Sequence, residues 1–380
     1  MKQTLRDYQE DCIANAGAFL GQSPLIVAPT GSGKTTIGVH LVKKLLELGY
    51  SVCWIAHRIE LMEQAAQRFE GEGVSVGFIK GGIKPSPLAR VQIASIQTLA
   101  NRKPTDYDIY VIDEAHRSVA ESYMKCLPRH AIRIGLTATP YRLDGRGLGY
   151  MFGKIIEAPT VVELVEMGHL LAPEVWTVNA PTMRGVKKRG GDYVVSSMEA
   201  LVDTPNMRAD MVKQWRTRCE GLRTLCFAVS IEHSKHIVED FNAQGVKAKH
   251  IDGGATKQER EDAIGMLKDG KIDMLSNVLL FTEGFDLPEI EALLLARPTA
   301  SLCMHMQMVG RVMRPSGKAI VHDHVNNHVR LGMVTQPLVY SLDDTATVKP
   351  KSEPLGMRSC PECFRMYSTK ENVCPSCGKE

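Results

Sequence analysis

The sequence predicts an α/β protein with two tandem parallel-sheet domains and a small cysteine-rich module at its C-terminal end. Short apolar runs alternate with helical stretches over residues 5–143 and again over 223–322. This alternation is typical of parallel sheets covered by helices on both faces. A glycine-rich segment follows the first apolar run, and four of the ten cysteines lie within residues 360–377.

The first domain is predicted to span residues 1–155. Its candidate strands are 25–27, 52–56, 91–94, 109–112 and 132–136. After the glycine-rich segment, Ile37, Leu41, Leu45 and Leu48 recur at the spacing of one helix face, and Gly49 is a typical helix stop. Strand, glycine loop and helix are therefore expected in that order.

The second domain is predicted over residues 156–334, with strands within 223–228, 246–251, 272–277, 291–296 and 318–322. Helices are expected through Ile237 and from Lys257. A polar stretch near 183–193 reads as a basic insertion. Residues 335–357, rich in Pro, Thr, Lys and Asp, are expected to form a linker, and 358–380 a cysteine module.

Composition places few limits on function. The net charge of +3 over 380 residues neither favours nor excludes nucleic acid, so binding must depend on local basic surfaces. The polar N-terminus and the lack of a long apolar run predict a protein without a membrane partner, in the cytoplasm of a bacterial or phage-infected cell. The other six cysteines are expected to be reduced, largely core residues: Cys12, Cys53, Cys126, Cys219, Cys226 and Cys303.

The glycine-rich segment APTGSGKT predicts a phosphate-binding loop. Glycines let backbone N–H groups converge on phosphate oxygens, Lys34 reaches the β- and γ-phosphates, and the Thr35 hydroxyl can ligate Mg²⁺. The residues expected to bind ATP here are Pro29, Thr30, Gly31, Ser32, Gly33, Lys34 and Thr35.

About eighty residues later, VIDEAH ends an apolar run. Asp113 is placed to hold the same Mg²⁺, and Glu114 to orient and deprotonate the attacking water. The two segments, in this order, predict ATP hydrolysis.

The C-terminal cysteines form two Cys-x-x-Cys pairs, Cys360 with Cys363 and Cys374 with Cys377. Two such turns complete a closed tetrahedral site of four sulfurs, which is typical of structural Zn²⁺. An iron–sulfur centre is the alternative for the same ligands. Disulfides are disfavoured in a reducing compartment.

The ordered motifs resemble superfamily 2 DEAH-box-type helicases and translocases, which have two RecA-like domains. Within that superfamily the chain is similar to RadD-type bacterial and phage DNA helicases, which carry zinc-binding cysteines. The motifs are LRDYQ, APTGSGKT, IAHRIEL, IASIQTL, DEAH, LTATP, FAVSIEHS, LFTEGFDLP and QMVGRVMR.

The resemblance implies a role for each motif. Arg6 and Gln9 would contact the adenine, and His116, Thr137 and Thr139 would couple nucleotide to nucleic acid. Arg311 and Arg314, spaced to share a helical face with Gln307, would act as arginine fingers. Gly284 and Asp286 would complete the nucleotide site. The DNA-binding residues implied are Arg58, Ser95, Gln97, Thr98, Ser230 and Thr282.

Two charged clusters leave alternatives open. Arg184, Lys187, Lys188 and Arg189 could contact DNA phosphates, act as a wedge, or be a solvated face. His322, Asp323, His324 and His328 suggest a metal, but by resemblance Asp323, His324 and Asn326 are expected to stabilise a cleft wall.

The function predicted is an ATP-dependent DNA helicase or translocase of replication, repair or recombination. The alternatives are a DNA-stimulated ATPase that remodels protein–DNA complexes, and an ATP-gated DNA adaptor. In the adaptor, the zinc module would dock a replication or repair protein. RNA is disfavoured by analogy with the DNA-translocating branch.

Overall fold

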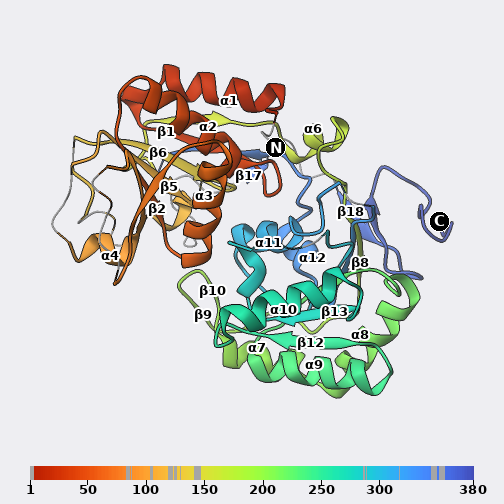
Figure 1. Cartoon of the computed structure of the whole chain (residues 1–380). Coiled ribbons are helices and arrows are strands. Elements are labelled where there is room, and N and C mark those ends of the chain that lie inside the picture. The colour runs from red at the N-terminus through yellow and green to blue at the C-terminus, as the bar shows by residue number, and fades with distance from the viewer. Residues whose placement is uncertain are drawn as a thin grey trace. The chain divides into compact units, whose positions relative to one another are not determined.

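The computed structural model describes residues 4–380 except 83–85, 87, 103–105, 119–122, 124–125, 129, 141–146, 286, 288, 316, 344–348 and 351–355. The chain divides into two compact units. The first comprises residues 1–160 with 338–349, and the second 161–337 with 350–380. Figure 1 traces the chain through both units. In the part of the chain that is described, no helix has both the length and the apolar character that a membrane crossing requires.

The first unit is built on a seven-stranded sheet in the order β3-β4-β2-β5-β6-β1-β7. The pairings are parallel throughout. The strands are β1 (Pro24–Val27), β2 (Val52–Ala56), β3 (Val76–Ile79), β4 (Val91–Ser95), β5 (Ile109–Asp113), β6 (Ile132–Thr137) and β7 (Lys154–Glu157). The helices are α1 (Asp7–Ala18), α2 (Lys34–Glu47), α3 (Ile59–Gly71) and α4 (Ile96–Ala100). The five predicted strands are present, and β3 and β7 are additional edge strands.

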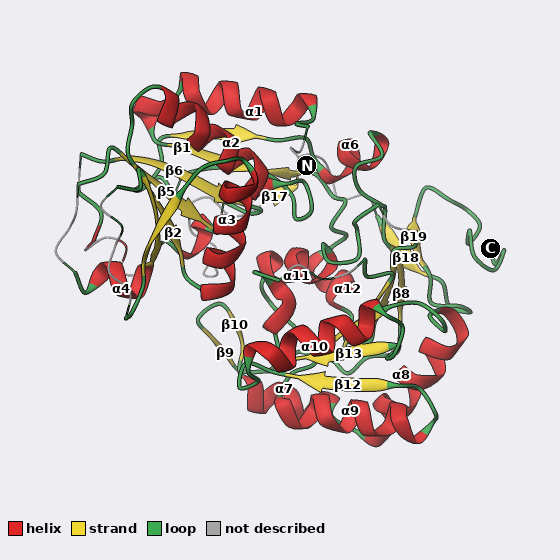
Figure 2. Ribbon diagram, in the orientation of Figure 1, coloured by secondary structure: helices red, strands yellow, loops and turns green. Residues whose placement is uncertain are grey.

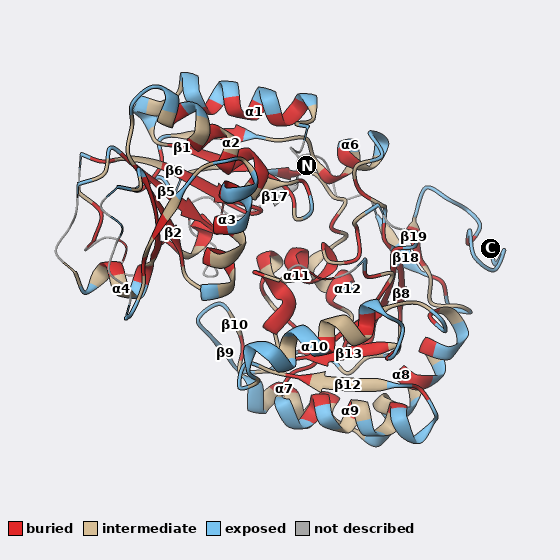
Figure 3. Cartoon of the chain, in the orientation of Figure 1, coloured by how far each residue is buried: buried red, intermediate tan, exposed pale blue. Residues whose placement is uncertain are grey.

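Strand residues of this sheet alternate between two apolar cores. Ile26 and Trp54 face the core shared with α1, α2 and α3, whereas their neighbours Leu25 and Cys53 face the opposite core. Because successive side chains of a strand point to opposite faces, strands buried on both sides are apolar at nearly every position. Figure 3 shows the inner strands β1, β2 and β5 buried along their length.

The second unit contains a six-stranded parallel sheet in the order β12-β13-β11-β14-β15-β8. Figure 2 shows its strands and helices. The strands are β8 (Glu174–Thr177), β11 (Thr224–Phe227), β12 (Ala248–Ile251), β13 (Met274–Asn277), β14 (Ala292–Leu295) and β15 (Ile320–Asp323). The helices are α6 (Val161–Glu166), α7 (Val195–Val202), α8 (Pro205–Arg218), α9 (Ile231–Ala243), α10 (Lys257–Lys268), α11 (Leu302–Val309) and α12 (Asn327–Leu331). Two parallel-sheet α/β units of RecA type were predicted, and this is confirmed.

The remaining strands form three short hairpin-like pairs. Lys188–Arg189 (β9) pairs antiparallel with Asp192–Tyr193 (β10) inside the basic insertion. Leu338–Val339 (β16) pairs with Lys349–Pro350 (β17). In the cysteine module, Met357–Ser359 (β18) pairs antiparallel with Met366–Ser368 (β19).

Two sequence expectations differ from the structure. Helix α2 ends at Glu47, so Leu48 is its C-cap and is 74% exposed rather than part of the buried face. Residues 338–343, expected within a linker, belong to the first unit, where the Leu342 carbonyl accepts the Gly149 N–H at 2.8 Å. Tyr340 and Leu342 pack against its core, so apolar side chains in a Pro-rich segment were the missed signal.

The closeness of α2 to the sheet gives a test. A Cβ on Gly38 would lie 2.6 Å from Leu136 Cδ1 and 2.7 Å from Trp54 Cη2. We expect Gly38→Ala to destabilise the protein by about 1–3 kcal/mol through overpacking, measured by urea unfolding. The matched control is Gly17→Ala in α1, where a Cβ meets no described atom within 4 Å. That change should be neutral or stabilising by about 0.4–1 kcal/mol. Equal effects of the two variants would contradict the packing argument.

Candidate functional site

The loop between β1 and α2 adopts a conformation that requires its glycines. Gly31 and Gly33 both have φ 89°, a left-handed region that only glycine enters without strain. The Ser32 hydroxyl, fully buried, donates to the Pro29 carbonyl at 2.7 Å and closes the turn. Helix α2 begins at Lys34, directly after the loop. The loop therefore lies at a helix N-terminus, where backbone N–H groups bind anions favourably.

Two residues of α1 fix the direction of one loop peptide. The Ser32 carbonyl accepts hydrogen bonds from Tyr8 Oη at 2.5 Å and Gln9 Nε2 at 3.0 Å. The carbonyl of Ser32 and the N–H of Gly33 belong to the same trans peptide and point in opposite directions. Holding the carbonyl against α1 therefore turns the Gly33 N–H away from α1. Tyr8 was not among the predicted site residues, although it stands inside the LRDYQ motif.

Gln9 is more occupied than its motif suggested. It is 5% exposed, and its Oε1 accepts the Arg6 backbone N–H at 3.1 Å while its Nε2 holds Ser32. The Arg6 guanidinium donates to Tyr8 Oη at 3.2 Å. Adenine recognition by Gln9 and Arg6 stays a prediction. In the structure, Gln9 also stabilises the phosphate loop through its hydrogen bond to the Ser32 carbonyl.

A chain of polar contacts joins the loop to the segments that follow β5 and β6. Lys34 Nζ lies 3.8 Å from Glu114 Oε1, and Glu114 Oε2 lies 3.4 Å from His116 Nδ1. His116 Nδ1 is in turn 3.2 Å from Thr137 Oγ1. The Thr137 hydroxyl donates its proton to the Thr139 carbonyl at 2.7 Å. In the contact between His116 Nδ1 and Thr137 Oγ1, the His116 nitrogen must therefore be the donor.

The backbone of this region is fixed as tightly as its side chains. Glu114 has φ 52°, a left-handed conformation that is strained for glutamate. Asp113, 3% exposed, accepts the Glu114 N–H at 3.0 Å. The two carboxylates follow directly from a buried parallel strand, so the strand end sets their positions.

The predicted DNA-contacting residues of the first unit cluster at neighbouring strand ends. Ala56 pairs with Ser95, so the segments after β2 and β4 begin side by side. The Ser95 hydroxyl donates to Gln97 Oε1 at 2.7 Å, and Gln97 Nε2 donates to the His57 carbonyl at 3.2 Å. Gln97 is exposed, and Arg58 and Thr98 are half-buried beside it.

Arg311 and Arg314 are not on a helix, contrary to the expectation from their spacing. Helix α11 ends at Val309, because Gly310 is its C-cap and Pro315 disfavours helical backbone at Arg314. Both guanidinium groups nevertheless converge on one loop. Arg311 donates to the Thr282 carbonyl at 2.5 Å and the Phe285 carbonyl at 3.3 Å, and Arg314 to the Leu287 carbonyl at 3.3 Å.

The loop that these arginines hold contains further predicted site residues. Gln307 Nε2, on α11, donates to Glu283 Oε1 at 2.7 Å. Gly284 has φ 78°, a left-handed conformation that favours glycine, and Asp286 lies outside the described residues. The Thr282 hydroxyl is buried and donates to the Leu279 carbonyl at 2.9 Å.

Ser230, at the end of β11, caps α9. Its hydroxyl oxygen accepts the His233 N–H at 3.1 Å and its hydroxyl contacts Glu199. Since β11 and β13 are neighbours, Ser230 and Thr282 follow adjacent strands. The two predicted DNA contacts of this unit therefore begin on the same edge of the sheet.

The basic insertion forms an anchored hairpin. Asp192 accepts the Ala300 N–H at 2.7 Å and the Thr299 hydroxyl at 3.0 Å, and lies 3.6 Å from Arg297. Lys188 and Arg189 are exposed on the opposite strand, with Arg184 and Lys187 leading into it. Fixed backbone with exposed cations is a suitable arrangement for phosphate contacts.

The histidine-rich segment after β15 has a structural network. Asp323, fully buried, accepts the His328 backbone N–H at 2.7 Å and its Nδ1 at 2.9 Å. Burial alone would raise the pKa of Asp323, but the hydrogen bonds from His328 hold it at about 2. His322 stacks on Trp176, with ring centroids 5.7 Å apart. Asn326, in left-handed backbone, caps α12.

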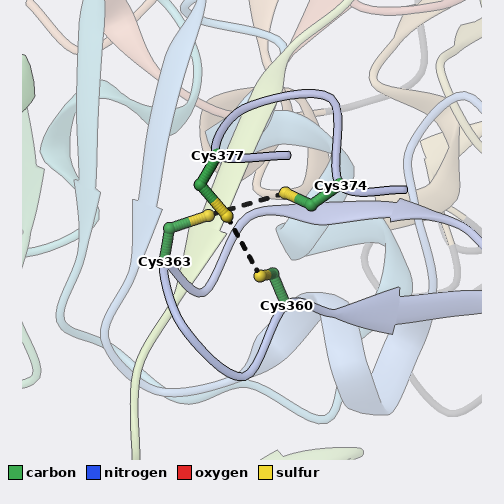
Figure 4. Close-up of side chains that lie close together, drawn as sticks. All are labelled: Cys360, Cys363, Cys374 and Cys377. Carbon is green, nitrogen blue, oxygen red and sulfur yellow. Dashed lines mark hydrogen bonds between the residues drawn. The ribbon is translucent and has the colours of Figure 1, made fainter. Parts of the chain in front are cut away.

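The four C-terminal cysteines converge as a metal site requires (Figure 4). Cys360 and Cys377 sulfurs lie 3.6 Å apart, as do those of Cys363 and Cys374, and all four lie within 4.8 Å of one another. A tetrahedron of Zn–S bonds of about 2.3 Å has sulfur–sulfur edges of about 3.8 Å. The Cys363 backbone N–H lowers the pKa of the Cys360 thiol to about 6, which favours the thiolate that a metal binds. The sulfur cage therefore fits Zn²⁺.

The two cysteine turns repeat one backbone pattern. Phe364 and Gly378, each four residues after the first cysteine of its pair, have φ 62° and 73°. Their N–H groups donate to the Cys360 and Cys374 carbonyls, at 2.9 and 3.0 Å. The sequence shows this only for Gly378, since a phenylalanine does not signal left-handed backbone.

The module packs on β8, the edge strand of the second unit's sheet. The Phe364 carbonyl accepts the Thr177 N–H at 2.9 Å, and Trp176 forms a bridge with Arg365. The Arg365 guanidinium lies 4.4 Å from the Trp176 ring and 2.9 Å from Glu174. The cysteine module thus covers backbone groups that an open sheet edge would expose.

Comparisons with known proteins match this architecture. The family model described as "Type III restriction enzyme, res subunit" matches residues 2–142, and "Helicase conserved C-terminal domain" matches 208–316. A 51.5 kDa protein of a Lactococcus phage is 29% identical over 94% of this chain and 78% of its own length. IRC3 of Saccharomyces cerevisiae, whose name describes an ATP-dependent helicase, is 28% identical over 82% of this chain. The chain spans about half of that yeast relative (49%).

Two further matches extend the comparison. A DNA 3'-5' translocase of Sulfurisphaera tokodaii, XPB2, is 25% identical over 83% of this chain and 80% of its own length. A solved fragment described as an HsdR subunit of a type I restriction enzyme from Vibrio vulnificus aligns with a TM-score of 0.67 and 21% identity. The alignment covers 87% of this chain and 66% of the Vibrio vulnificus fragment. At this identity the solved fragment supports the fold alone.

The metal site gives a second test. We expect the purified protein to carry one zinc per chain by elemental analysis, and Cys363→Ser with Cys377→Ser to release it. Because the module covers β8, metal loss should lower the melting temperature of the second unit as well as unfold the tail. Cys219→Ser, a buried cysteine outside the cage, should retain zinc. Iron with visible absorption, or full zinc retention in the double variant, would contradict the assignment.

Proposed function

Because the chain belongs to the superfamily 2 helicases, we propose that it couples ATP hydrolysis to movement along DNA, as a helicase or translocase. The observation that carries this proposal is the contact chain Lys34–Glu114–His116–Thr137. It joins the phosphate loop to the acidic segment and to the threonine segment, so a change at the nucleotide can move groups at three strand ends.

Each group in the first unit has a proposed task. The loop N–H groups and Lys34 bind the phosphates, and Glu114 accepts a proton from the attacking water. Thr35 and Asp113 would hold Mg²⁺, which neutralises phosphate charge when it is bound. On nucleotide binding Lys34 exchanges its carboxylate partner for phosphate, which frees Glu114 to receive the water. His116 contacts both Glu114 and Thr137, so a movement of Glu114 on nucleotide binding is transmitted through His116 to Thr137.

In the second unit, Arg311 and Arg314 are proposed to stabilise charge on the transferred phosphoryl group. Each currently donates to a backbone carbonyl of residues 282–287. These carbonyls are neutral acceptors, and a negatively charged phosphate oxygen is a stronger acceptor for the same guanidinium groups. If the arginines exchanged the carbonyls for phosphate oxygens, the loop that carries Thr282 and Gly284 would be released. This links nucleotide state to a proposed DNA-contacting segment.

DNA is the proposed partner because the helicase-type relatives include a DNA translocase. The proposed contacts are to the sugar-phosphate backbone, at Arg58 and Ser95 in the first unit and at Ser230 and the Lys187–Arg189 strand in the second. Backbone contacts position a strand without reading sequence, as movement along DNA requires. We propose that the protein moves along DNA during replication, repair or recombination.

The proposed function is tested by ATP hydrolysis measured without nucleic acid and with single-stranded DNA, duplex, forked DNA and RNA. DNA should stimulate turnover and RNA should not. Displacement of a third strand from a triplex then reports translocation, and release of a labelled strand from a fork reports unwinding. Stimulation without either movement would favour remodelling of protein–DNA complexes, and no stimulation by DNA would refute the proposal.

The catalytic assignment makes a separate prediction. Glu114→Gln should bind ATP and hydrolyse it at least about 100-fold more slowly, because it loses the general base. Lys34→Ala should lose nucleotide-dependent activity altogether. Glu10→Gln, an exposed change on α1, is the matched carboxylate control and should leave turnover unchanged. A wild-type rate in Glu114→Gln would exclude this base.

The arginines make a third functional prediction. Arg311→Ala and Arg314→Ala should each reduce kcat by about 10³-fold or more with a smaller change in ATP affinity. Both constants are measured for each variant, with the melting temperature as a monitor of the loop that these arginines brace. A loss confined to ATP affinity at unchanged kcat would show that they do not act on the transition state.

A further inference from the structure

A cavity of about 270 Å³ lies at the carboxyl ends of β8 and β15 in the second unit. It is lined by residues after each strand, by α8, and by Phe364 of the cysteine module: Val178, Asn179, Asn206, Met207, Asp210, Gln214, His324 and Phe364. Crevices outside the carboxyl ends of parallel strands are where α/β folds bind ligands. None of the roles described above uses this cavity.

One lining side chain is buried without a full set of partners. His324 is 1% exposed, and its Nε2 has no hydrogen-bond partner among the described residues. Its Nδ1 lies 3.8 Å from Asp210 Oδ2, beyond hydrogen-bond range. A buried ring nitrogen without a partner carries a desolvation cost that a ligand atom or water would remove.

The Asp210 carboxylate in the cavity lining is held in place by a series of hydrogen bonds along α8. Asp210 Oδ1 accepts Gln214 Nε2 at 3.1 Å, and Gln214 Oε1 accepts Arg218 Nη1 at 2.6 Å. Arg218 Nη2 donates to the Cys363 carbonyl at 3.3 Å. This ladder runs along one face of α8 at spacings of four residues and ends on the cysteine turn. The carboxylate is therefore preorganised while its second oxygen stays available.

The lining selects the ligand by chemistry. It contains a carboxylate and no Lys or Arg, so a phosphate would be repelled. The amide groups of Asn179 and Asn206, the His324 imidazole and Phe364 suit a flat, neutral group with hydrogen-bond donors. The volume is below the roughly 300–1,000 Å³ of sites for drug-sized ligands, which fits a single ring system. An unstacked nucleobase meets these conditions.

The position of the cavity supports the same ligand. Ser230 follows β11, and the cavity lies after β15 and β8, on the same edge of the same parallel sheet. Strands β11, β14, β15 and β8 are successive neighbours, at about 4.8 Å per step. A DNA strand at Ser230 therefore reaches the cavity in about 10–14 Å, which is about three to four nucleotides at roughly 3.4 Å each. The anchored hairpin is fixed to residues 299–300, which follow β14 on that edge.

We propose that this cavity binds one extruded base of single-stranded DNA and favours bases with an exocyclic amino group. Asp210 accepts the amino N–H, His324 Nε2 meets the adjacent ring edge, and Phe364 contacts the base. Cytosine presents its N4 amino group to the carboxylate, whereas thymine presents the O4 oxygen at the same place. The inference rests on the proposed DNA partner and adds a base preference to contacts that otherwise ignore sequence.

The experiment compares binding of dC12 and dT12, which carry equal charge, over a salt series. Wild type should bind dC12 about fivefold or more tightly. In Asp210→Asn, which keeps size and removes the charge, this ratio should fall to near one. The slope of log Kd against log salt should not change, because no phosphate contact is lost. Lys188→Ala is the matched control, and should lower that slope by about one while it keeps the dC12 preference.

The outcomes separate this inference from the proposed function. Equal affinities of wild type for dC12 and dT12, or a preference that persists in Asp210→Asn, would overturn the base pocket. DNA-stimulated ATP hydrolysis would still support the translocase in that case. Melting temperature and DNA-independent ATPase of Asp210→Asn confirm that the variant is folded. A second variant, His324→Gln, should weaken binding of dC12 more than of dT12.

Discussion

Parallel strand pairing is the constraint on which the rest of this molecule depends. In both sheets every described pairing is parallel, so all carboxyl ends of a sheet lie on one edge. The phosphate loop follows β1, the acidic segment β5 and the threonine segment β6, on neighbouring strands. Residues more than one hundred positions apart are thus brought within about one or two strand spacings, roughly 5–10 Å, by strand pairing.

Within that frame, the site residues have structural partners that nucleotide or DNA would replace. Gln9 and Tyr8 fix the Ser32–Gly33 peptide, and Arg311 fixes the carbonyls of a second-unit loop. Such partners prevent buried polar groups from going unsatisfied when no ligand is bound. They also make ligand binding an exchange of hydrogen bonds, so a nucleotide can alter a loop without a large net change in free energy.

The cysteine module shows how a small cluster of four cysteines can serve a larger sheet. A segment of this size buries too little apolar surface to fold alone, so a metal bound by the four sulfurs would supply folding energy. Its second cysteine turn uses Gly378, but the first places Phe364 in left-handed backbone. That position lets the Phe364 carbonyl accept the Thr177 N–H, and Phe364 also lines the cavity that contains His324. Edge protection and the cavity wall are therefore consequences of one turn.

The sequence by itself determined the strands, the glycine-rich loop after β1, the pair of carboxylates at the end of β5 and the cysteine cage. Each depends on local signals: apolar runs, glycine placement, a charged pair after a strand, or Cys-x-x-Cys spacing. Only the tertiary structure decided that Arg311 donates to the Thr282 carbonyl, that Tyr8 braces the loop, that residues 338–343 join the first unit, and that the module covers β8. These features depend on contacts between segments distant in the chain. Hydrogen-bond satisfaction and core packing select such contacts, so a local signal such as the apolar residues of 338–343 does not specify the partner segment.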